Sequence, residues 1–395
     1  MRLWRRRAAP AAPPPAPEPL SASEELLRRA VEDLLVVRER QVRGGIVVFR
    51  GELRVPPTRA VDALLERFRP LGFTPFLRAE RDGVAVQAWP LAGAPAPQRV
   101  RVNVLLFAVT CVSVLAAGAQ FSGSPTFDAL RASPSVARFL VGVPFAVTLL
   151  GILGVHEFGH YFTARAYRAS VSLPYFIPLP FGWGTLGAII LMRSPVRNRD
   201  VSFDIAAAGP LAGLAVALPA MLLGLGWSRV APIPPGGYAV FGDSLLTSLL
   251  TWVQLGPIPD GSMVYTHPVA DAAWAGFLVT ALNLFPVGQL DGGRIAYALF
   301  GRHHPTLGKA TVVALLAFGT AVFAWGALAG RGVLPGLLAS LNWFVWAALI
   351  AFLVGFHHNP PLDDVTPLSP GRRLLGILCL LLIVLLTPPV LMQEG

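Results

Sequence analysis

Long apolar runs follow one another after residue 100, and they set the prediction for the architecture. A helix needs about 20 apolar residues to cross the hydrocarbon core of a bilayer. Runs close to this length lie at 102–120, 139–162, 203–226, 268–288, 309–329, 335–355 and 374–392. We therefore expect a polytopic α-helical membrane protein with about seven transmembrane helices.

Two stretches between these runs have a different pattern. Residues 181–192, FGWGTLGAIILM, are too short to cross and are rich in Gly and β-branched residues. Non-helical backbone at membrane depth is tolerated only against protein or a cavity, so we predict an extended, β-like re-entrant loop here. Residues 236–258 include Asp243 and Pro257 and predict a loop with an interfacial helix.

Shorter amphipathic elements in residues 21–97 predict a small soluble α+β domain. A helix is expected through EELLRRAVEDLLVVRER, with acids early and bases late as the helix dipole prefers. GIVVFRGEL (45–53) predicts a strand, and TRAVDALLERFRPLG (58–72) predicts a second helix. TPFLRAE and VAVQAWP predict a hairpin with its turn at Asp82-Gly83. The expected order after the first helix is βαββ.

Segments rich in Pro and Ala flank this domain. The basic N-terminus continues into a Pro/Ala stretch where a signal peptide would need an apolar core. We therefore expect residues 1–20 to be a disordered tail. LAGAPAPQ (91–98) is expected to be the linker to the membrane part.

Composition and charge support a membrane location. The chain is 54% hydrophobic and 14% charged, whereas soluble proteins carry about a quarter charged residues. Its net charge of +10 comes mainly from Arg residues that flank apolar runs, which favours topology signals over nucleic-acid binding. The expected environment is thus a lipid bilayer, and no nucleic-acid partner is expected. Cys111 and Cys379 lie inside apolar runs and predict neither a disulfide framework nor a Cys-based metal site.

Arg and Lys residues near the ends of the runs predict the orientation. With the N-terminus in the cytosol, ten of them lie on the cytosolic side and four lie opposite. The cytosolic group is Arg165, Arg168, Arg193, Arg197, Arg199, Arg294, Arg302, Lys309, Arg372 and Arg373. The expected location is a bacterial inner membrane with a cytosolic N-terminus.

The second apolar run contains the motif HExxH, formed by His156, Glu157 and His160. Two His residues four positions apart lie on one helix face, one turn apart, so both imidazoles can reach a single zinc ion. Glu157 stands beside the first His, where it can take a proton from zinc-bound water. A chance occurrence is disfavoured, because ionisable residues at membrane depth are costly.

Asp291 is the candidate third ligand. A catalytic zinc usually has three protein ligands and one open position. Asp291 lies at the end of the fourth apolar run, and the predicted topology puts it near the cytosolic side, as it does the His pair. The alternative is a plain Asp-Gly turn leaving the membrane. We expect one Zn²⁺ per chain.

The two motifs together resemble the site-2 protease family of intramembrane zinc metalloproteases. HExxH in one span and N-x-x-P-x-x-x-L-D-G in a later one carry the resemblance, which covers roughly residues 139–294. It implies that His156, His160 and Asp291 bind zinc and that Glu157 is the catalytic acid/base. It also implies a substrate-binding role for Gly184, Thr185, Leu186 and Gly187, in a loop that pairs with an extended substrate, and for Asn283 and Pro286, which would shape the substrate groove.

The front domain is similar to one branch of this family. FRGELR (49–54) is similar to the F-R-G-N-L-R stretch of the ethylene-dependent gravitropism-deficient and yellow-green proteins of chloroplasts and cyanobacteria. Glu52 replaces the Asn, and Gln289-Leu290 precede Asp291 where that branch has Asn-Pro. The expected domains are the tail, the soluble domain 21–97, a catalytic membrane core 98–300 and C-terminal transmembrane helices 301–395.

The resemblance implies regulated intramembrane proteolysis, in which peptide bonds in or near transmembrane segments of membrane proteins are cleaved. The substrate partner is then a transmembrane protein, and the sequence leaves the oligomeric state open. One alternative is a membrane metal transporter, which would need no Glu beside the first His and would carry ligands on several spans. Another is an inactive protease-like membrane chaperone, which would be expected to have a broken motif.

Three further features have competing interpretations. Asn283 could equally serve as an amide that joins neighbouring helices. Gly209 and Gly213 form a G-x-x-x-G pair, which favours close helix packing. HHNPPLDD (357–364) favours a solvated cytosolic loop over a second metal site.

Overall fold

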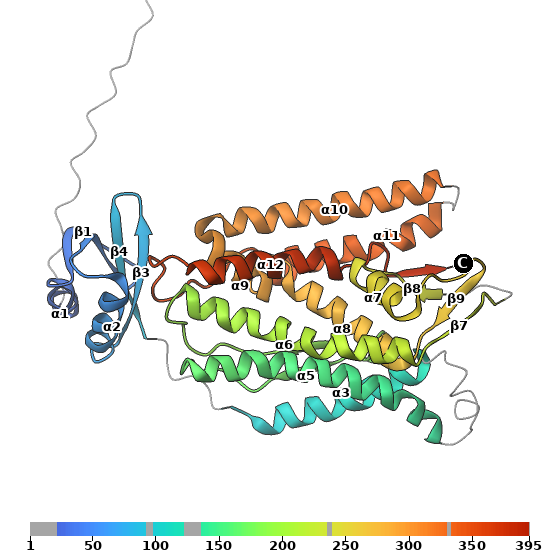
Figure 1. Ribbon diagram of the computed structural model, residues 1–395. Helices are drawn as coiled ribbons and strands as arrows, with labels where there is room; N and C mark the ends of the chain where they lie inside the picture. Colours follow the sequence, from blue (N-terminus) through green and yellow to red (C-terminus); the bar gives the residue numbers. More distant parts are fainter. Residues whose placement is uncertain (1–21, 92–97, 122–135, 235–238, 330–332, 395) are drawn as a thin grey trace, which may run out of the picture. The chain divides into compact units, whose positions relative to one another are not determined.

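The computed structural model describes residues 22–91, 98–121, 136–234, 239–329 and 333–394 (Figure 1). The chain divides into two compact units, Met1–Gly93 and Ala94–Gly395. The predicted tail at 1–20 and most of the predicted linker lie outside the described residues.

The N-terminal unit is a four-stranded antiparallel sheet with two helices, which confirms an α+β domain. The sheet order is β1-β2-β4-β3. Its core contains Leu27 and Leu64 of the helices and Phe49 and Leu77 of the sheet, all without exposed surface. The elements are α1 (Ala22–Val31), β1 (Leu35–Arg43), β2 (Ile46–Leu53), α2 (Pro57–Phe68), β3 (Phe73–Glu80) and β4 (Gly83–Pro90).

The long first helix predicted for this unit is wrong. Helix α1 ends at Val31, and strand β1 occupies most of the remaining stretch, so the order after α1 is ββαββ. The reason lies in Gly44 and Gly45, which have φ angles of +56° and +81° and join β1 to β2 in a two-residue turn, with Arg43 opposite Ile46. Such turns match the right-handed twist of paired strands, and the pairing outweighs a weak helical preference.

The second unit is a bundle of long apolar helices, which confirms a polytopic membrane protein. Within the described residues, five helical segments are long and apolar enough to cross a membrane: Val100–Gln120, Phe139–Ala166, Arg199–Gly226, Asp291–Leu328 and Val333–Val354. They correspond to five of the seven predicted runs. The runs predicted at 268–288 and 374–392 form helices of 17 residues each, α8 (Pro268–Leu284) and α12 (Pro370–Leu386). The count of seven is therefore not confirmed.

The remaining helices complete the described part of this unit. They are α3 (Val100–Phe121), α5 (Val143–Ala166), α6 (Arg199–Gly226), α7 (Leu245–Leu255), α9 (Asp291–Phe300), α10 (His304–Leu328) and α11 (Val333–Leu349). Short 3₁₀ segments η2 (Val136–Gly142) and η3 (Gly301–His303) precede α5 and α10, and a π-helical turn η4 (Ile350–Val354) follows α11. Helix α7 lies within the stretch predicted to contain a helix.

In the described part of this unit, three short antiparallel strand pairs lie between the helices. They are β5 (Tyr175–Pro178) with β6 (Thr185–Ile189), β7 (Arg229–Pro232) with β9 (Ser262–Tyr265), and β8 (Ala239–Phe241) with β10 (Met392–Glu394). Strand β6 confirms that the stretch 181–192 contains extended backbone.

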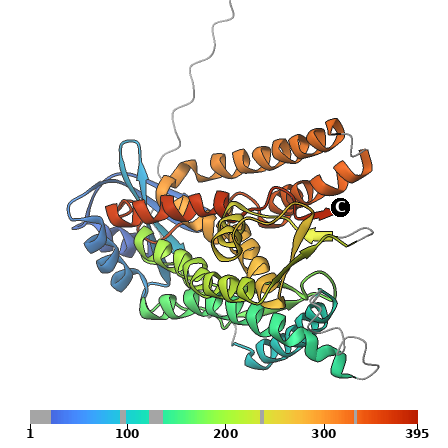
Figure 2. The same cartoon turned by 45° about the vertical axis from the view of Figure 1, so that its right-hand side comes forward.

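Helices α5, α6 and α8 pack together and form the core of the membrane unit (Figures 1 and 2). Large side chains such as Phe145, Phe203 and Phe277 are fully buried among them. Small residues allow close approach: a Cβ at Gly159 of α5 would lie 2.8 Å from the carbonyl oxygen of Ala208 on α6. In lipid, where little hydrophobic force drives helices together, such close packing is the main source of association.

Candidate metal centre

Helix α5 carries both histidines of the HExxH motif on one buried face. His156, Glu157 and His160 are 2%, 4% and 8% exposed. The two imidazole rings lie one helical turn apart, with centroids separated by 4.9 Å. The motif therefore stands inside the bundle, as the spacing predicts.

Asp291 comes from a separate helix and is its first residue. Helix α8 ends at Leu284, a turn follows, and Asp291 begins α9. Two glycines make this return possible, because a Cβ at Gly292 would lie 1.7 Å from the carbonyl oxygen of Leu284, and one at Gly293 would lie 2.4 Å from that of Val287. The sequence Asp-Gly-Gly thus folds α9 tightly against the end of α8 and puts the carboxylate beside α5.

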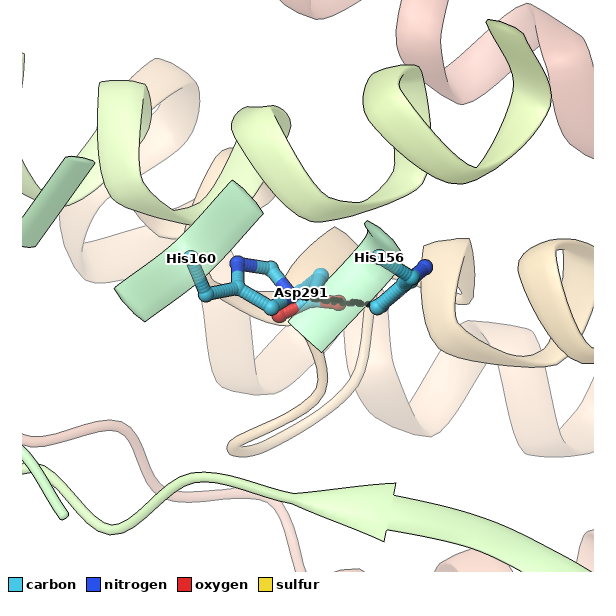
Figure 3. Close-up of side chains that lie close together, drawn as sticks. All are labelled: His156, His160 and Asp291. Carbon is cyan, nitrogen blue, oxygen red and sulfur yellow. Dashed lines mark hydrogen bonds and ion pairs between the residues drawn. The ribbon is translucent and has the colours of Figure 1, made fainter. Parts of the chain in front are cut away.

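The three side chains converge on one point (Figure 3). The Nε2 atoms of His156 and His160 are 3.2 Å apart, and Asp291 Oδ2 lies 3.4 Å and 3.1 Å from them. One donor atom from each residue lies within 4.8 Å of the other two. Among the described residues, this is the one group of three His, Cys, Asp or Glu side chains with such spacing.

Helix α6 orients the second histidine. His160 Nδ1 lies 2.6 Å from the carbonyl oxygen of Ile205. A carbonyl only accepts hydrogen bonds, so Nδ1 carries the proton and the lone pair of Nε2 faces the other two ligand atoms. This backbone contact is what a metal-binding imidazole requires, so the donor set fits a zinc ion with two nitrogen ligands and one oxygen ligand.

Glycines of α6 leave room for both rings. A Cβ at Gly209 would lie 2.1 Å from His160 Nε2, and a Cβ at Gly213 would lie 3.2 Å from His156 Cβ. The G-x-x-x-G pair therefore packs against the imidazoles themselves, in addition to bringing α6 close to α5. The sequence predicts that this glycine pair lets helices approach closely. It does not reveal that the imidazoles of His156 and His160 lie opposite the glycines.

Asn283 of α8 extends toward the first histidine. Its Nδ2 lies 3.4 Å from His156 Nε2, at the long end of hydrogen-bond distance. The contact joins α8 to α5, as expected for an amide that links neighbouring helices. A role for Asn283 in substrate binding stays a prediction.

A cavity of about 120 Å³ opens beside these side chains. Glu157, His160, Asn283, Asp291 and Arg294 line it, together with Ala188, Ile189 and Ile190. Of the residues predicted to bind substrate, only Asn283 lines this cavity. Gly184, Thr185, Leu186 and Gly187 precede the lining residues in the β5–β6 hairpin, and Pro286 lies in the turn before α9.

The hairpin is held from inside and exposed on one edge. Thr185 Oγ1 donates to the carbonyl oxygen of Ile177 and accepts from the N–H of Gly187, at 2.9 Å and 3.0 Å. Gly184 lies against α3, where a Cβ would come within 2.5 Å of the Ser113 carbonyl oxygen. Leu186 is 67% exposed. Strand β6 is therefore held in place, with Leu186 and Ile189 exposed and with its end at the cavity.

The segment 357–364 is not the solvated loop that its composition favours. Asp363 is 1% exposed and accepts hydrogen bonds from the N–H groups of Val365 and Thr366. Asp364 forms an ion pair with Arg199 at 3.0 Å and accepts a hydrogen bond from Tyr297. Local capping and pairing bury these carboxylates, which the sequence pattern does not reveal.

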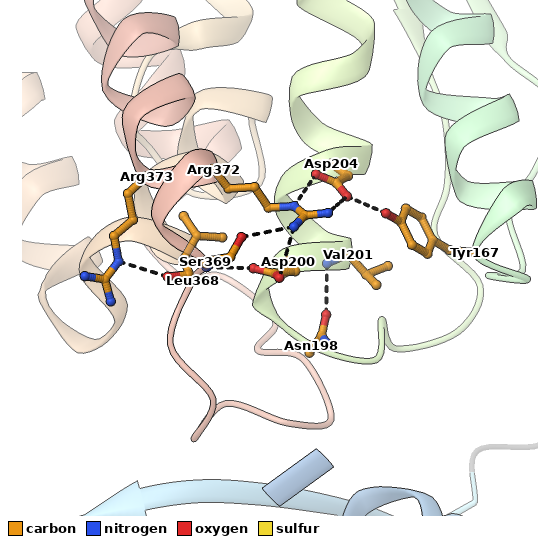
Figure 4. A network of polar contacts seen from close by, with 9 residues as sticks. All are labelled: Tyr167, Asn198, Asp200, Val201, Asp204, Leu368, Ser369, Arg372 and Arg373. Atoms are coloured by element: carbon orange, nitrogen blue, oxygen red, sulfur yellow. Dashed lines mark hydrogen bonds and ion pairs between the residues drawn. The ribbon is translucent and has the colours of Figure 1, made fainter. Parts of the chain in front are cut away.

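A second polar network joins the start of α6 to α12 (Figure 4). Arg372 donates to both carboxylate oxygens of Asp204 at 2.7 Å and to Asp200 at 3.2 Å, and Tyr167 donates to Asp204. These contacts tie the start of α6 to the start of α12, at the helix ends nearer to the histidine pair.

The fold and the site define a class: helical membrane proteins with a buried group of two histidines and one aspartate that could hold a metal ion, and a glutamate beside it. Residues 144–326 match the model of Peptidase family M50. Through this segment, which is a little under half of the chain, the protein is similar to that family of site-2 proteases, and the donor set of His156, His160 and Asp291 fits the Zn²⁺ ion of such metalloproteases.

Individual relatives are similar to the chain as well. The chain is 33% identical over 256 residues to "Probable zinc metalloprotease EGY1, chloroplastic" of Arabidopsis thaliana, with 63% of this chain and 43% of the relative covered. It is 32% identical over 269 residues to "Probable zinc metalloprotease EGY2, chloroplastic" of the same plant, with 66% and 44% covered. The chain thus spans less than half the length of these curated relatives.

A solved structure also matches. "Site-2 Protease from Methanocaldococcus jannaschii" is 16% identical, with 63% of this chain and 91% of that chain covered, at a TM-score of 0.30.

Proposed function

We propose that this chain is an intramembrane zinc metalloprotease that hydrolyses peptide bonds in or near transmembrane segments of membrane proteins. The observation that carries the proposal is the convergence of His156, His160 and Asp291 within 4.8 Å, next to buried Glu157, inside a bundle of apolar helices. A zinc ion bound there supplies Lewis-acid polarisation of a carbonyl and makes water more acidic.

The chain's own residues divide the remaining work. Glu157 lines the cavity beside His160, where its carboxylate accepts a proton from the attacking water and passes it to the leaving amine. The contact of His160 with Ile205 keeps the imidazole in one tautomer throughout. The surrounding helices exclude bulk water, which strengthens each electrostatic interaction in the site.

Strand β6 is proposed to hold the substrate in extended form. A helical substrate hides its carbonyls in backbone hydrogen bonds, so it must unwind before hydrolysis. The exposed Leu186 and the cavity-lining residues 188–190 support pairing of an unwound segment along β6, since strand addition is a common way to bind peptides. Gly184, Thr185 and Gly187 then shape the hairpin, and Asn283 and Pro286 border the groove.

The proposed topology has seven spans and a cytosolic N-terminus. Helices α8 and α12 have 17 residues, which is the lower limit for crossing a bilayer. Arg372 at the start of α12 and Arg199 at the start of α6 support the cytosolic assignment of that side. The membrane is proposed to be a bacterial inner membrane, whereas the names of the two plant relatives place those proteins in chloroplasts.

The two alternatives are less well supported. A metal transporter needs ligands along a path, whereas the described residues contain a single three-ligand group. An inactive chaperone needs no intact acid/base residue, whereas Glu157 lines the cavity at the metal centre.

Cleavage of a single-span test protein by the purified chain in detergent tests the proposal. We expect cleavage by the wild type, none after chelation, and loss of activity in Glu157→Gln with about one zinc per chain retained. Asp291→Ala should lose zinc as well as activity, whereas His357→Ala, at an exposed histidine, should lose neither. Persistent cleavage by Glu157→Gln would contradict the assignment of the acid/base residue.

A further inference from the structure

Arg294 is a charged side chain at the metal centre to which the reaction above assigns no role. It lies in α9, three residues after Asp291. A charged group that is largely removed from water is costly unless its donors are paired, so its presence at this site calls for a reason. Arg294 lines the same cavity as Glu157, His160 and Asp291.

The contacts of Arg294 differ from those of the other half-buried arginines nearby. Its Nε has no exposed surface and no hydrogen-bond partner. Within the described residues, no carboxylate lies within ion-pair distance of its guanidinium. Arg199 and Arg372, by contrast, pair with Asp364 and Asp204 at 3.0 Å and 2.7 Å. A buried donor without a partner requires an explanation, because leaving it unpaired costs about 1–3 kcal/mol.

The groups around Arg294 do not supply the missing acceptor. Oδ2 of Asp291 lies between the two histidine nitrogens, at 3.1 Å and 3.4 Å. No hydrogen bond joins Arg294 to the rings of His304 and His358 either. Arg294 lines the cavity, so an acceptor that enters from outside the chain can reach its side chain there.

We propose that Arg294 donates a hydrogen bond to the carbonyl oxygen of the scissile peptide as that oxygen gains negative charge. The inference rests on the proposed function and deepens it. Water oxygen bonds to the carbonyl carbon, its proton goes to Glu157, and the carbon–nitrogen bond then breaks as the amine takes that proton. Arg294 keeps its own protons throughout and stabilises the charged oxygen, which makes it a catalytic residue of the same reaction.

Removal of the guanidinium should then slow the chemical step without disturbing metal or substrate binding. We expect Arg294→Ala to lower kcat about 100- to 1,000-fold, the loss typical for one donor to a developing oxyanion. KM should stay within about threefold, since the interaction forms mainly in the transition state. Zinc affinity, measured by chelator competition, should stay within about threefold as well.

Two further variants separate catalysis from folding. Arg294→Lys keeps the buried charge but loses the planar fork, and it should recover about tenfold over Arg294→Ala. Added methylguanidinium should restore part of the kcat of Arg294→Ala, which a merely structural role would not produce. Arg199→Met removes a half-buried arginine that is paired away from the cavity, so it should lower Tm and leave kcat unchanged.

Each other outcome overturns the inference. A kcat within tenfold of wild type shows that the donor is dispensable. Zinc affinity that falls together with kcat assigns Arg294 to positioning Asp291. A rise in KM alone assigns it to ground-state binding. If the wild type cleaves and Arg294→Ala cleaves equally well, only this inference fails, whereas a wild type that cleaves nothing refutes the proposed function first.

Discussion

Replacing Gly209 by Ala should damage the metal centre through one added methyl group. The new Cβ would lie 2.1 Å from His160 Nε2, 2.4 Å from Cε1 and 2.5 Å from Cδ2. Ordinary contact begins near 3.4 Å, so the ring and helix α6 must separate by about 1.3 Å, against a tolerance of about 0.2 Å for metal–ligand bonds. The displaced atom is the one that faces Asp291 and His156.

The expected loss of zinc affinity follows from this displacement. Changes in residues that merely support a ligand cost about 10- to 100-fold in affinity. A change that moves the ligand atom itself should cost about 100-fold or more, equivalent to about 2.7 kcal/mol. Movement of α6 instead of the ring would not avoid the cost, because α6 carries the Ile205 carbonyl that orients His160.

Chelator competition in detergent measures the effect, with two glycines as matched controls. Gly213→Ala puts a Cβ 3.2 Å from His156 Cβ, a contact relieved by a shift of a few tenths of an ångström, so its loss should be smaller than about tenfold. Gly154→Ala, two residues before His156 on α5, meets nothing within 4 Å and should bind zinc normally. Zinc binding by Gly209→Ala within threefold of wild type would refute the reasoning.

Three other substitutions have defined outcomes. Arg372→Leu removes the cation that pairs with Asp204 and Asp200, and since these carboxylates are 20% and 30% exposed, the unfolding free energy should fall by about 1–2 kcal/mol in a denaturation assay. Burial, and then the charge of Arg294, lowers the pKa of His358 to about 3. The unfolded state therefore binds a proton at this residue before the folded state does, and the free energy of unfolding decreases as the pH falls from about 6.5 toward 3. His358→Gln should flatten this acid limb of a Tm–pH profile. Thr185→Val removes two hydrogen bonds of the hairpin and should raise KM severalfold with zinc content unchanged, and an unaltered KM would argue against substrate pairing on β6.

Local periodicity predicts the parts of this protein that depend on one segment. The spacing of His156 and His160 is a property of a single helix, so it could be derived before the fold was known. The paired glycines at 44–45 are an equally local signal, because two such residues favour a tight turn between two strands. The turn predicts strand β1 before it, whereas the order of acidic and basic residues predicts a helix there, and the turn is the stronger signal.

Contacts between segments could not be derived in the same way. Arg294 stands among ten positive residues near predicted span ends, and its position three residues after Asp291 does not reveal whether it pairs with a carboxylate. Only the fold shows that Arg199 and Arg372 find carboxylates and that Arg294 does not. Partner choice for a long side chain depends on distant segments, so burial and pairing must be read from the structure.

The glycines of α6 illustrate why packing and chemistry share residues in this bundle. Small residues favour helix association in lipid, whatever lies opposite. Here the opposite face of α5 carries the imidazoles, so the groove that lets the helices approach is also the space in which the rings stand. A larger residue at 209 would therefore disturb the metal ligands and helix packing together, whereas one at 154 would disturb neither. The depth of the site in the bundle thus follows from the register of α6 against α5, which Gly159 and Gly209 set from opposite sides.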